Sequence, residues 1–204
     1  MERWRTVGRV RAYVGLGANV GDPTGTLAAA VHALARLPGV RLRGVSRLYA
    51  TEPVGVLDQP EFRNAVVALD VPAGPDPATG ASALLVALKG LERAFGRRDR
   101  ERWGPREVDL DLLVFGRQRV NVERPSGGHS EDPAKATLPL VVPHVEAQHR
   151  LFVLAPLSDL APGLVPPAWG ETAATAAARQ RRLEGADAAR PIATWAGDGW
   201  LPLA

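Results

Sequence analysis

The chain has 204 residues, of which 46% are hydrophobic and 23% charged, with a formal net charge of +3 and no cysteine. These values exclude wholesale disorder, collagen-like repeats and a coiled coil as descriptions of the whole chain, and the lack of thiols excludes disulfides, thiolate nucleophiles and zinc–cysteine sites. The apolar runs fall far short of the ~20 residues of a membrane span, and the start lacks the apolar segment of a secretory signal. We therefore expect a cytoplasmic protein without membrane contact.

Apolar periodicity predicts four strands and two helices in the first 115 residues, and Asp22 or Thr24 can cap the first helix. The expected elements are a strand at 10–16, a glycine-rich turn at 15–22, a helix ending at Pro38, strands at 40–49 and 62–69, a helix with Leu84, Leu88, Leu91 and Phe95 on one face, and a strand at 108–115. The order βαββαβ is typical of a ferredoxin-like α+β sandwich. Its antiparallel sheet has helices on one face, so the other face is expected to be free for ligands and their loops.

The rest of the chain is less regular. Residues 125–139 are polar and rich in Pro, Gly and Ser, which predicts a surface insertion. Residues 144–157 predict a short helix with its loop. We therefore expect one domain over residues 1–167, followed by a C-terminal extension over 168–204 whose packing the sequence does not predict.

The basic residues are concentrated before the last of these strands. Of the 25 basic residues only Lys89 and Lys135 are lysines, and residues 93–106 hold six arginines against two acids, a local charge of +4. Planar guanidinium groups suit phosphate. Charge runs are more often solvated loops, but here the run also encloses Trp103-Gly-Pro and leads directly into a strand that carries two carboxylates.

Those carboxylates, Asp109 and Asp111, share one face of the strand because side chains alternate with a period of two. Two like charges in an apolar strand are costly unless a hard cation neutralises them, and carboxylates with water are what Mg²⁺ prefers. An isolated Asp-x-Asp would be interpreted as a solvated pair. With six arginines upstream, we favour a metal and a polyphosphate, which is the apparatus of phosphoryl transfer.

Two further candidates are weaker taken alone. Phe62 and Asn64 share a strand face, where a ring and an amide could stack on and bond to a flat heterocycle. Composition alone prefers a core Phe beside an exposed Asn. A lone histidine such as His144 is more often structural than catalytic.

The stretch R-W-G-P-R-E-V-D-L-D at residues 102–111 resembles the signature R-W-G-P-R-x-x-D-x-D of the 6-hydroxymethyl-7,8-dihydropterin pyrophosphokinase family. The resemblance covers residues 10–167 in order and includes G-A-N-V-G-D at 17–22, T-E-P-V-G at 51–55, D-Q-P-E-F-R-N at 58–64 and V-P-H at 142–144. It implies a ferredoxin-like fold that transfers pyrophosphate from ATP to the pterin hydroxymethyl group and releases AMP, in folate biosynthesis.

The resemblance also implies roles for individual residues. Asp109 and Asp111 would hold two Mg²⁺ ions, and Trp103 would close over the site. The catalytic set would be Arg97, Arg106, Trp103, Asp109 and Asp111. The ATP site would contain Lys89, Glu92, Arg97, Arg106, Leu112, Arg124, His144 and Arg150. The pterin site would contain Thr51, Val54, Phe62, Asn64, Trp103 and Phe152, with Phe62 and Phe152 as the stacking rings.

Two other functions are compatible with the pattern. A ferredoxin-like sheet with exposed aromatics and basic loops can bind RNA, although no RNP-like aromatic motif occurs and the two aspartates would repel phosphate without a metal. Another Mg-dependent nucleotidyl transferase is the third reading. We expect small-molecule substrates, no nucleic acid, and contact with neighbouring folate-pathway enzymes.

Overall fold

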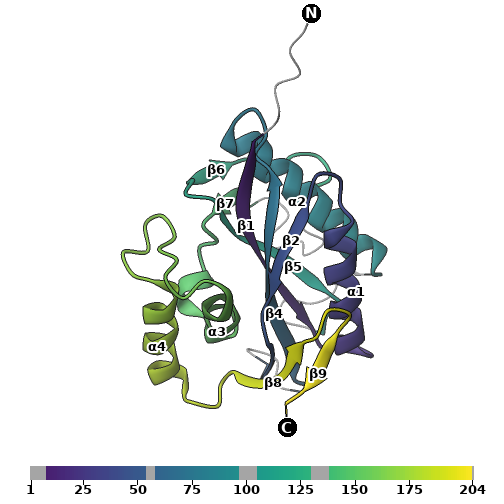
Figure 1. The fold of residues 1–204 in the computed structure, drawn as a ribbon, viewed down its shortest axis with the longest axis vertical. Helices are drawn as coiled ribbons and strands as arrows, with labels where there is room; N and C mark the ends of the chain where they lie inside the picture. Colours follow the sequence, from purple (N-terminus) through teal and green to yellow (C-terminus); the bar gives the residue numbers. More distant parts are fainter. Residues whose placement is uncertain (1–7, 54–57, 97–104, 130–137, 204) are drawn as a thin grey trace, which may run out of the picture.

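The computed structural model describes residues 8–53, 58–96, 105–129 and 138–203. Seven antiparallel strands of the described residues form the central sheet, in the order β5-β1-β4-β3-β8-β9 with β2 also paired to β4. They are β1 (Arg9–Ala18), β2 (Arg41–Val45), β3 (Leu48–Thr51), β4 (Phe62–Pro72), β5 (Asp109–Phe115), β8 (Arg190–Trp195) and β9 (Trp200–Pro202). A second small sheet pairs β6 (Val120–Val122) with β7 (Leu140–Val142). Figure 1 shows this arrangement.

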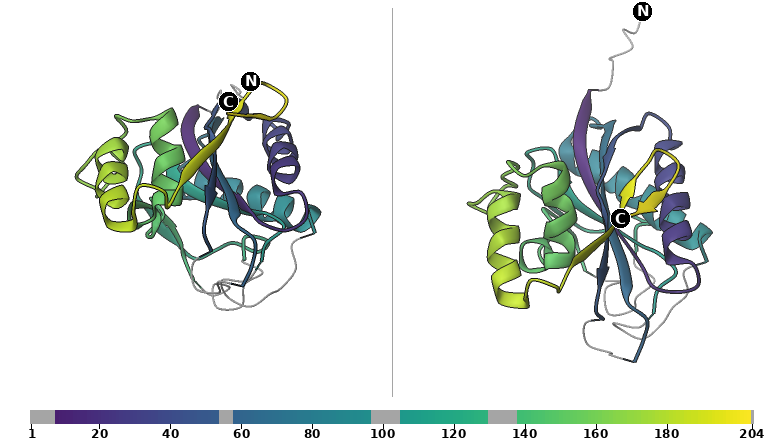
Figure 2. Two further views of the ribbon diagram at one scale, coloured as in Figure 1. Left: turned by 90° about the horizontal axis from the view of Figure 1, so that it is seen from below. Right: turned by 60° about the horizontal axis from the view of Figure 1, so that its bottom comes forward.

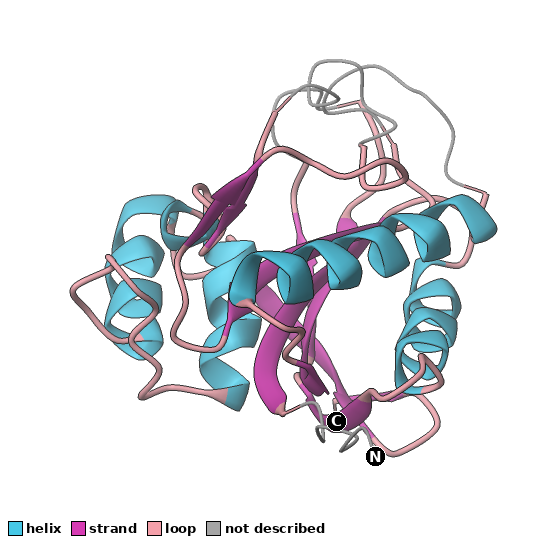
Figure 3. Cartoon of the chain, turned by 90° about the horizontal axis from the view of Figure 1, so that it is seen from above, coloured by secondary structure: helices cyan, strands magenta, loops and turns pink. Residues whose placement is uncertain are grey.

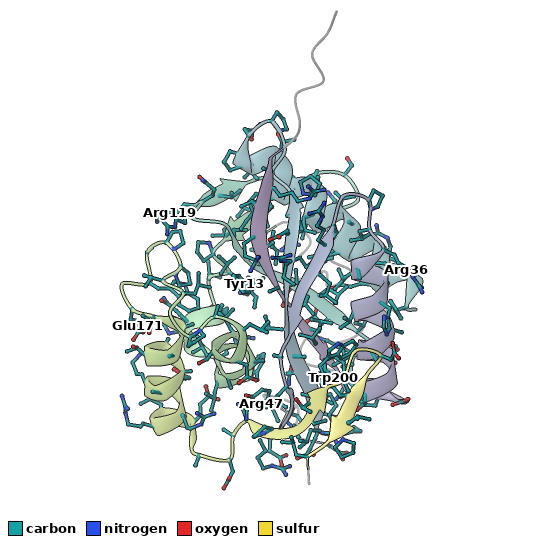
Figure 4. All side chains as sticks on the ribbon, viewed as in Figure 1. Tyr13, Arg36, Arg47, Arg119, Glu171 and Trp200 are labelled. Carbon is teal, nitrogen blue, oxygen red and sulfur yellow. The ribbon has the colours of Figure 1, made fainter. Side chains whose placement is uncertain are left out.

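Helices lie on both sides of the central sheet (Figure 3). The helical elements are α1 (Pro23–Ala35), α2 (Pro77–Ala94), the 3-10 turn η1 (Ala147–His149), α3 (Leu151–Leu160) and α4 (Ala173–Glu184). Leu27 of α1 and Leu88 of α2 join the main core on one face, whereas α3 packs on β4 and buries Leu157 with Tyr13 and Val66 on the other. Figure 4 shows Tyr13 on the α3 side of β1.

The predicted ferredoxin-like α+β fold, with α1 and α2 on one face of an antiparallel sheet, is confirmed. The expectation that the other face is free is wrong where α3 covers it. The apolar positions of α3 explain this cover, because Leu151, Leu154 and Leu157 are all fully buried. Over the described residues, we find no helix that is both long and apolar enough to span a bilayer.

Both core helices begin at an aspartate cap. Asp22 accepts a hydrogen bond from the Gly25 amide at 3.0 Å, and Asp76 accepts one from the Thr79 amide at 2.9 Å. Each helix starts with a proline, which is suited to the first turn because the missing N–H would have no helical partner there. Of the two caps considered for the first helix, the structure selects Asp22.

The single strand predicted at residues 40–49 is wrong, because it is divided into β2 and β3 at Ser46. The Ser46 hydroxyl accepts a hydrogen bond from the Val66 amide at 2.9 Å, while the Ser46 amide donates to the Val66 carbonyl at 3.0 Å. A side-chain oxygen therefore replaces a backbone acceptor in the ladder with β4. After this break, β3 pairs with the part of β4 that lies nearer to the site described below.

The C-terminal part of the chain packs onto this body. Strand β8 pairs with β3, and β9 turns back so that Trp200, 6% exposed, enters the main core and donates its indole N–H to the Ser46 carbonyl at 2.9 Å. His32 of α1 contacts the carbonyl of Asp198 at 3.0 Å, and Figure 2 shows the β8–β9 hairpin beside α1. The packing of residues 168–203 is thus known, and the domain boundary at 167 stays a prediction.

Candidate active site

A row of polar groups crosses three strands at one end of the sheet. Asp109 of β5 lies opposite Gly17 of β1, and Gly17 lies opposite Asn64 of β4. Asp111 lies opposite Gly15 in the same way. Directly paired residues share a face of the sheet, so both carboxylates and the Asn64 amide face the α3 side.

The two glycines are part of strand β1, so the predicted glycine-rich turn at residues 15–22 is wrong for them. The turn follows Ala18, and Gly21 supplies its positive φ of 65°. Within the strand, Gly15 and Gly17 place no side chain between the aspartates and Asn64. A Cβ atom on Gly17 would lie 3.1 Å from the Asn64 side-chain oxygen, so the amide lies directly over the glycine.

A buried ion pair from α2 fixes the backbone between the two aspartates. Lys89 and Glu92 are 4% and 0% exposed, and their charged atoms lie 2.6 Å apart. Glu92 accepts from the Leu110 amide at 2.7 Å, and Lys89 donates to the Leu110 carbonyl at 3.2 Å. Since β5 is an edge strand, these outward-facing groups need such partners. The predicted place of Lys89 and Glu92 around the nucleotide stays a prediction.

Asn19 connects the segments that enter β4 and β5. It is 2% exposed, and its side chain donates to the Gln59 side chain and to the Pro60 carbonyl, both at 3.0 Å. Its side-chain oxygen accepts from the Arg106 amide at 2.8 Å, and its own amide donates to the Arg106 carbonyl at 3.0 Å. The backbone of Arg106 is thereby held on both sides, and its guanidinium forms an ion pair with Asp109.

The candidate pterin residues are placed by β3 and β4. Asn64, 6% exposed, donates to the hydroxyl of Thr51, 5% exposed, at 2.8 Å. Phe62 is the register partner of Thr51 and is partly exposed. The alternative of a core Phe beside an exposed Asn is therefore wrong, because the amide is buried and the ring reaches solvent.

The remaining nucleotide candidates approach β5 from other elements. Burial lowers the pKa of the Arg124 guanidinium, while the negative charges of Asp111 and Glu92 act in the opposite direction, so Arg124 lies within electrostatic reach of both. The His144 amide donates to the Leu113 carbonyl at 2.9 Å. Leu112 differs, because its side chain lies in the main core on the α1–α2 side and only its backbone remains for a ligand.

Arg150 and Phe152 flank the start of α3. Arg150 is the N-cap residue, lies with its guanidinium carbon 5.7 Å from the centre of the Phe152 ring, and pairs with Glu146 at 3.2 Å. Val54, Arg97 and Trp103 lie outside the described residues, so the structure places none of them.

From the sequence, Gly15, Gly17 and Asn19 are placed in a turn and in the motif of residues 17–22, but they are assigned no role in the site. Within the described ranges, no three His, Asp or Glu side chains gather as a metal site. The candidate metal ligands are thus a pair of carboxylates.

Three comparisons with known proteins bear on this site. Residues 13–162 match the family model of 7,8-dihydro-6-hydroxymethylpterin-pyrophosphokinase. A Pseudomonas aeruginosa protein named 2-amino-4-hydroxy-6-hydroxymethyldihydropteridine pyrophosphokinase is 44% identical over 76% of this chain and 82% of its own length. A protein of the same name from Methylorubrum extorquens is 40% identical over 83% of this chain and 92% of its own length.

The fold itself is shared with a crystal structure described as Plasmodium falciparum HPPK-DHPS wild type with pterin and p-hydroxybenzoate. The TM-score is 0.70 and the identity 16%, and the match covers 98% of this chain. It covers 49% of the crystallised chain, so the present chain spans about half of that protein. Together with the family match and the two bacterial relatives, the geometry leads to one conclusion: the chain belongs to the 7,8-dihydro-6-hydroxymethylpterin-pyrophosphokinase family.

Proposed function

We propose that pyrophosphate transfer takes place at the end of the sheet where Asp109, Gly17 and Asn64 lie side by side. As a family member, the chain is an ATP-dependent pyrophosphokinase of folate biosynthesis, and ATP is its co-substrate. The hydroxymethyl oxygen of the pterin forms a bond to the β-phosphorus of ATP, the bond to the α-phosphate oxygen breaks, and AMP leaves. The single observation that carries the proposed location is the strand register. It puts two carboxylates and a buried amide on one face of the sheet, with Gly17 between Asp109 and Asn64.

The carboxylate pair fits Mg²⁺. Mg²⁺ is usually bound through one or two carboxylates plus the substrate's phosphates, not by a cage built entirely of protein groups. Asp109 and Asp111 provide such a set, and Glu92 and Lys89 hold their strand in place. Mg²⁺ bound there would neutralise the charge on the phosphate oxygens; we propose two ions, as in the sequence-based prediction. The protein's own contribution is to hold both carboxylates on one face with no β1 side chain between them and Asn64.

Two arginines place positive charge near the carboxylate pair. Arg106 has a fixed backbone and a guanidinium that Asp109 holds near the carboxylates, and Arg124 lies within electrostatic reach of Asp111. Donors fixed before the reaction stabilise developing charge without a cost of reorganisation. We therefore assign Arg106 to the transferring phosphates and Arg124, with His144 and Arg150, to the rest of the nucleotide.

The pterin is assigned to the β3–β4 side of the row. Asn64 is oriented by Thr51, so its amide is fixed to read the edge of a flat heterocycle, and Phe62 offers a partly exposed ring beside it. Phe152 at the start of α3 is proposed as the second ring. This order places the pterin at Asn64 and the triphosphate at the aspartates, across Gly15 and Gly17.

Alanine variants of Phe62 and Asn64 test the pterin assignment. Each is expected to weaken pterin binding by ~5-fold, because stacking and a buried hydrogen bond are each worth about 1 kcal/mol. Turnover at saturating pterin should change much less, because these contacts act about equally in the ground and transition states. The measurement is calorimetric titration of a hydroxymethylpterin in the presence of a non-hydrolysable ATP analogue, with steady-state kinetics alongside.

Asn121 on β6 is exposed and serves as the matched control. Asn121→Ala should leave both the pterin affinity and the rate unchanged. An unaltered pterin affinity in folded Phe62→Ala and Asn64→Ala proteins would exclude this face as the pterin site.

The position of α3 counts against the RNA-binding alternative. An RNA-binding ferredoxin-like domain stacks bases on its open sheet face, and α3 packs on β4 over that face. Absence of nucleic-acid binding remains a prediction, as does cytoplasmic location. The Plasmodium falciparum structure is described as HPPK-DHPS, and the match covers 49% of its chain. This supports our proposal that the present chain works in contact with a neighbouring folate-pathway enzyme.

A further inference from the structure

We infer that the chain beyond residue 162, where the family match ends, positions both proposed pterin rings, through Glu184 and Arg190. This inference rests on the proposed function, because it takes Phe62 and Phe152 as the stacking rings. Glu184 holds the start of the helix that carries Phe152, and Arg190 holds the residue directly before Phe62.

The start of α3 has no cap of its own. Arg150 occupies the N-cap position and forms no side-chain cap hydrogen bond. The amide of Leu151 donates instead to Glu184 at the end of α4, at 2.9 Å, and Gln180 donates to the same carboxylate oxygen at 2.8 Å. A carboxylate at a helix N-terminus satisfies a free amide and complements the helix dipole. Glu184 of α4 therefore supplies the N-terminal cap that the side chain of Arg150 does not provide.

A second contact from α4 holds the turn before this helix. Arg179 donates to the backbone carbonyl of Gln148 at 2.9 Å, and its guanidinium is itself oriented by Glu171 at 3.0 Å. Figure 4 shows Glu171 on the outer side of α4. Residues 148 and 151 enclose Arg150 and adjoin Phe152, so both side chains project from a backbone that α4 fixes at two points.

The other end of α3 is held differently. Asp159 accepts hydrogen bonds from the Arg47 guanidinium at 2.6 Å and from the Tyr49 hydroxyl at 3.0 Å. Those three residues all lie inside the family match. Loss of Glu184 would therefore leave α3 docked at its C-terminal end and would remove one of the two α4 contacts at the end that bears Phe152.

The Phe62 side is held by β8. Arg190 is the register partner of Ala50 on β3, next to Thr51, and its guanidinium forms an ion pair with Glu61. Glu61 also accepts from Arg63 at 3.2 Å. The carboxylate before Phe62 is thus held between two arginines, one of them from the C-terminal strand.

These contacts matter more for placement than for folding. Both Glu184 and Arg190 are exposed at the surface, where a single ion pair contributes less than ~1 kcal/mol to the free energy of unfolding and a helix cap contributes about 1 kcal/mol. A flat heterocycle between two rings needs both rings at one separation, and a misplacement of ~1 Å can cost up to ~100-fold. We expect Glu184→Ala and Arg190→Ala each to raise the pterin KM and Kd about 5-fold, with kcat and the ATP KM within about 2-fold of the parent.

The experiment compares these two variants with Glu184→Gln, which keeps an oxygen able to accept from Leu151 and should restore the pterin KM. Arg182→Ala is the matched control, because Arg182 is an exposed arginine of α4 with no hydrogen bond or ion pair among the described contacts. Thermal unfolding is measured for every variant. A pterin-specific loss with a nearly unchanged Tm, rescued by Glu184→Gln, supports the inference.

Two outcomes overturn it. The first is an unchanged pterin KM in Glu184→Ala and Arg190→Ala, which excludes the positioning role. The second is a parallel fall of kcat, ATP affinity and Tm, because a merely structural contact would give that result. Phe62→Ala and Phe152→Ala are measured alongside to separate the two proposals. If they weaken pterin binding and Glu184→Ala does not, only the present inference fails; if they do not, the proposed pterin site fails and this inference with it.

Discussion

Asp109→Asn and Asp111→Asn are each expected to lower kcat roughly a thousandfold while the chain stays folded. Each substitution keeps the shape of the side chain and removes the charge that would hold Mg²⁺. A bound metal supplies several kcal/mol of stabilisation to developing phosphate charge, and ~4 kcal/mol corresponds to about a thousandfold in rate. Folding should tolerate the change, because the carboxylates face the row at the sheet end and Leu110 and Leu112 form the core side of the strand.

Steady-state kinetics over a range of Mg²⁺ concentrations, with thermal unfolding, measures this effect. Asp70→Asn is the control, because Asp70 lies near the other end of β4 from Asn64 and pairs with Arg11 at 2.7 Å and Arg43 at 3.2 Å. Its loss should leave kcat unchanged. Near-normal turnover in either folded site variant would exclude that aspartate as a metal ligand.

Arg106→Ala is expected to lower kcat about 100-fold or more, with a much smaller loss of ATP affinity. Asn19 fixes the Arg106 backbone on both sides, and Asp109 holds its guanidinium beside the carboxylate pair. A donor held at the place where charge develops stabilises the transition state more than the bound substrate, and removing one such donor typically costs ~3 kcal/mol. The loss should therefore appear in kcat and in kcat/KM together.

Direct titration with a non-hydrolysable ATP analogue separates binding from the rate. Arg36→Ala is the control, since Arg36 is an exposed arginine at the end of α1, on the outer edge of the molecule in Figure 4. Arg97→Ala is predicted to behave as Arg106→Ala does. If Arg106→Ala lost only ATP affinity at an unchanged kcat, the arginine would be an electrostatic anchor and not a catalytic residue.

Local signals predicted most of the fold. Strands with a period of two, helices with apolar side chains at helical spacing, and the cap at Asp22 lie within a few residues of their expected places. The break at Ser46 was not predictable, because it depends on a hydroxyl that meets Val66 from a strand 20 residues away. The cover of the second face by α3 also depends on tertiary packing that no local pattern contains.

The sequence predicted the site residues whose charge indicates chemistry. It did not predict the residues that only set the geometry of the site. Asp109 and Asp111 stand out because charge in an apolar strand is costly. Gly15 and Gly17 suggest a turn when taken alone, and the place of Gly17 between Asp109 and Asn64 depends on the register of β1 with its two neighbours. Glu184 gives no signal at all, since it caps a helix that begins 33 residues earlier in the chain.

The central claim is that this chain transfers pyrophosphate and not a single phosphate. Its most direct test is to incubate the protein with Mg·ATP and a reduced hydroxymethylpterin and to identify the nucleotide and pterin products by chromatography and mass spectrometry. The account predicts AMP and the pterin diphosphate in equal amounts, and no turnover without the pterin. Release of ADP, or of free pyrophosphate with the nucleotide left on an acceptor, would contradict it.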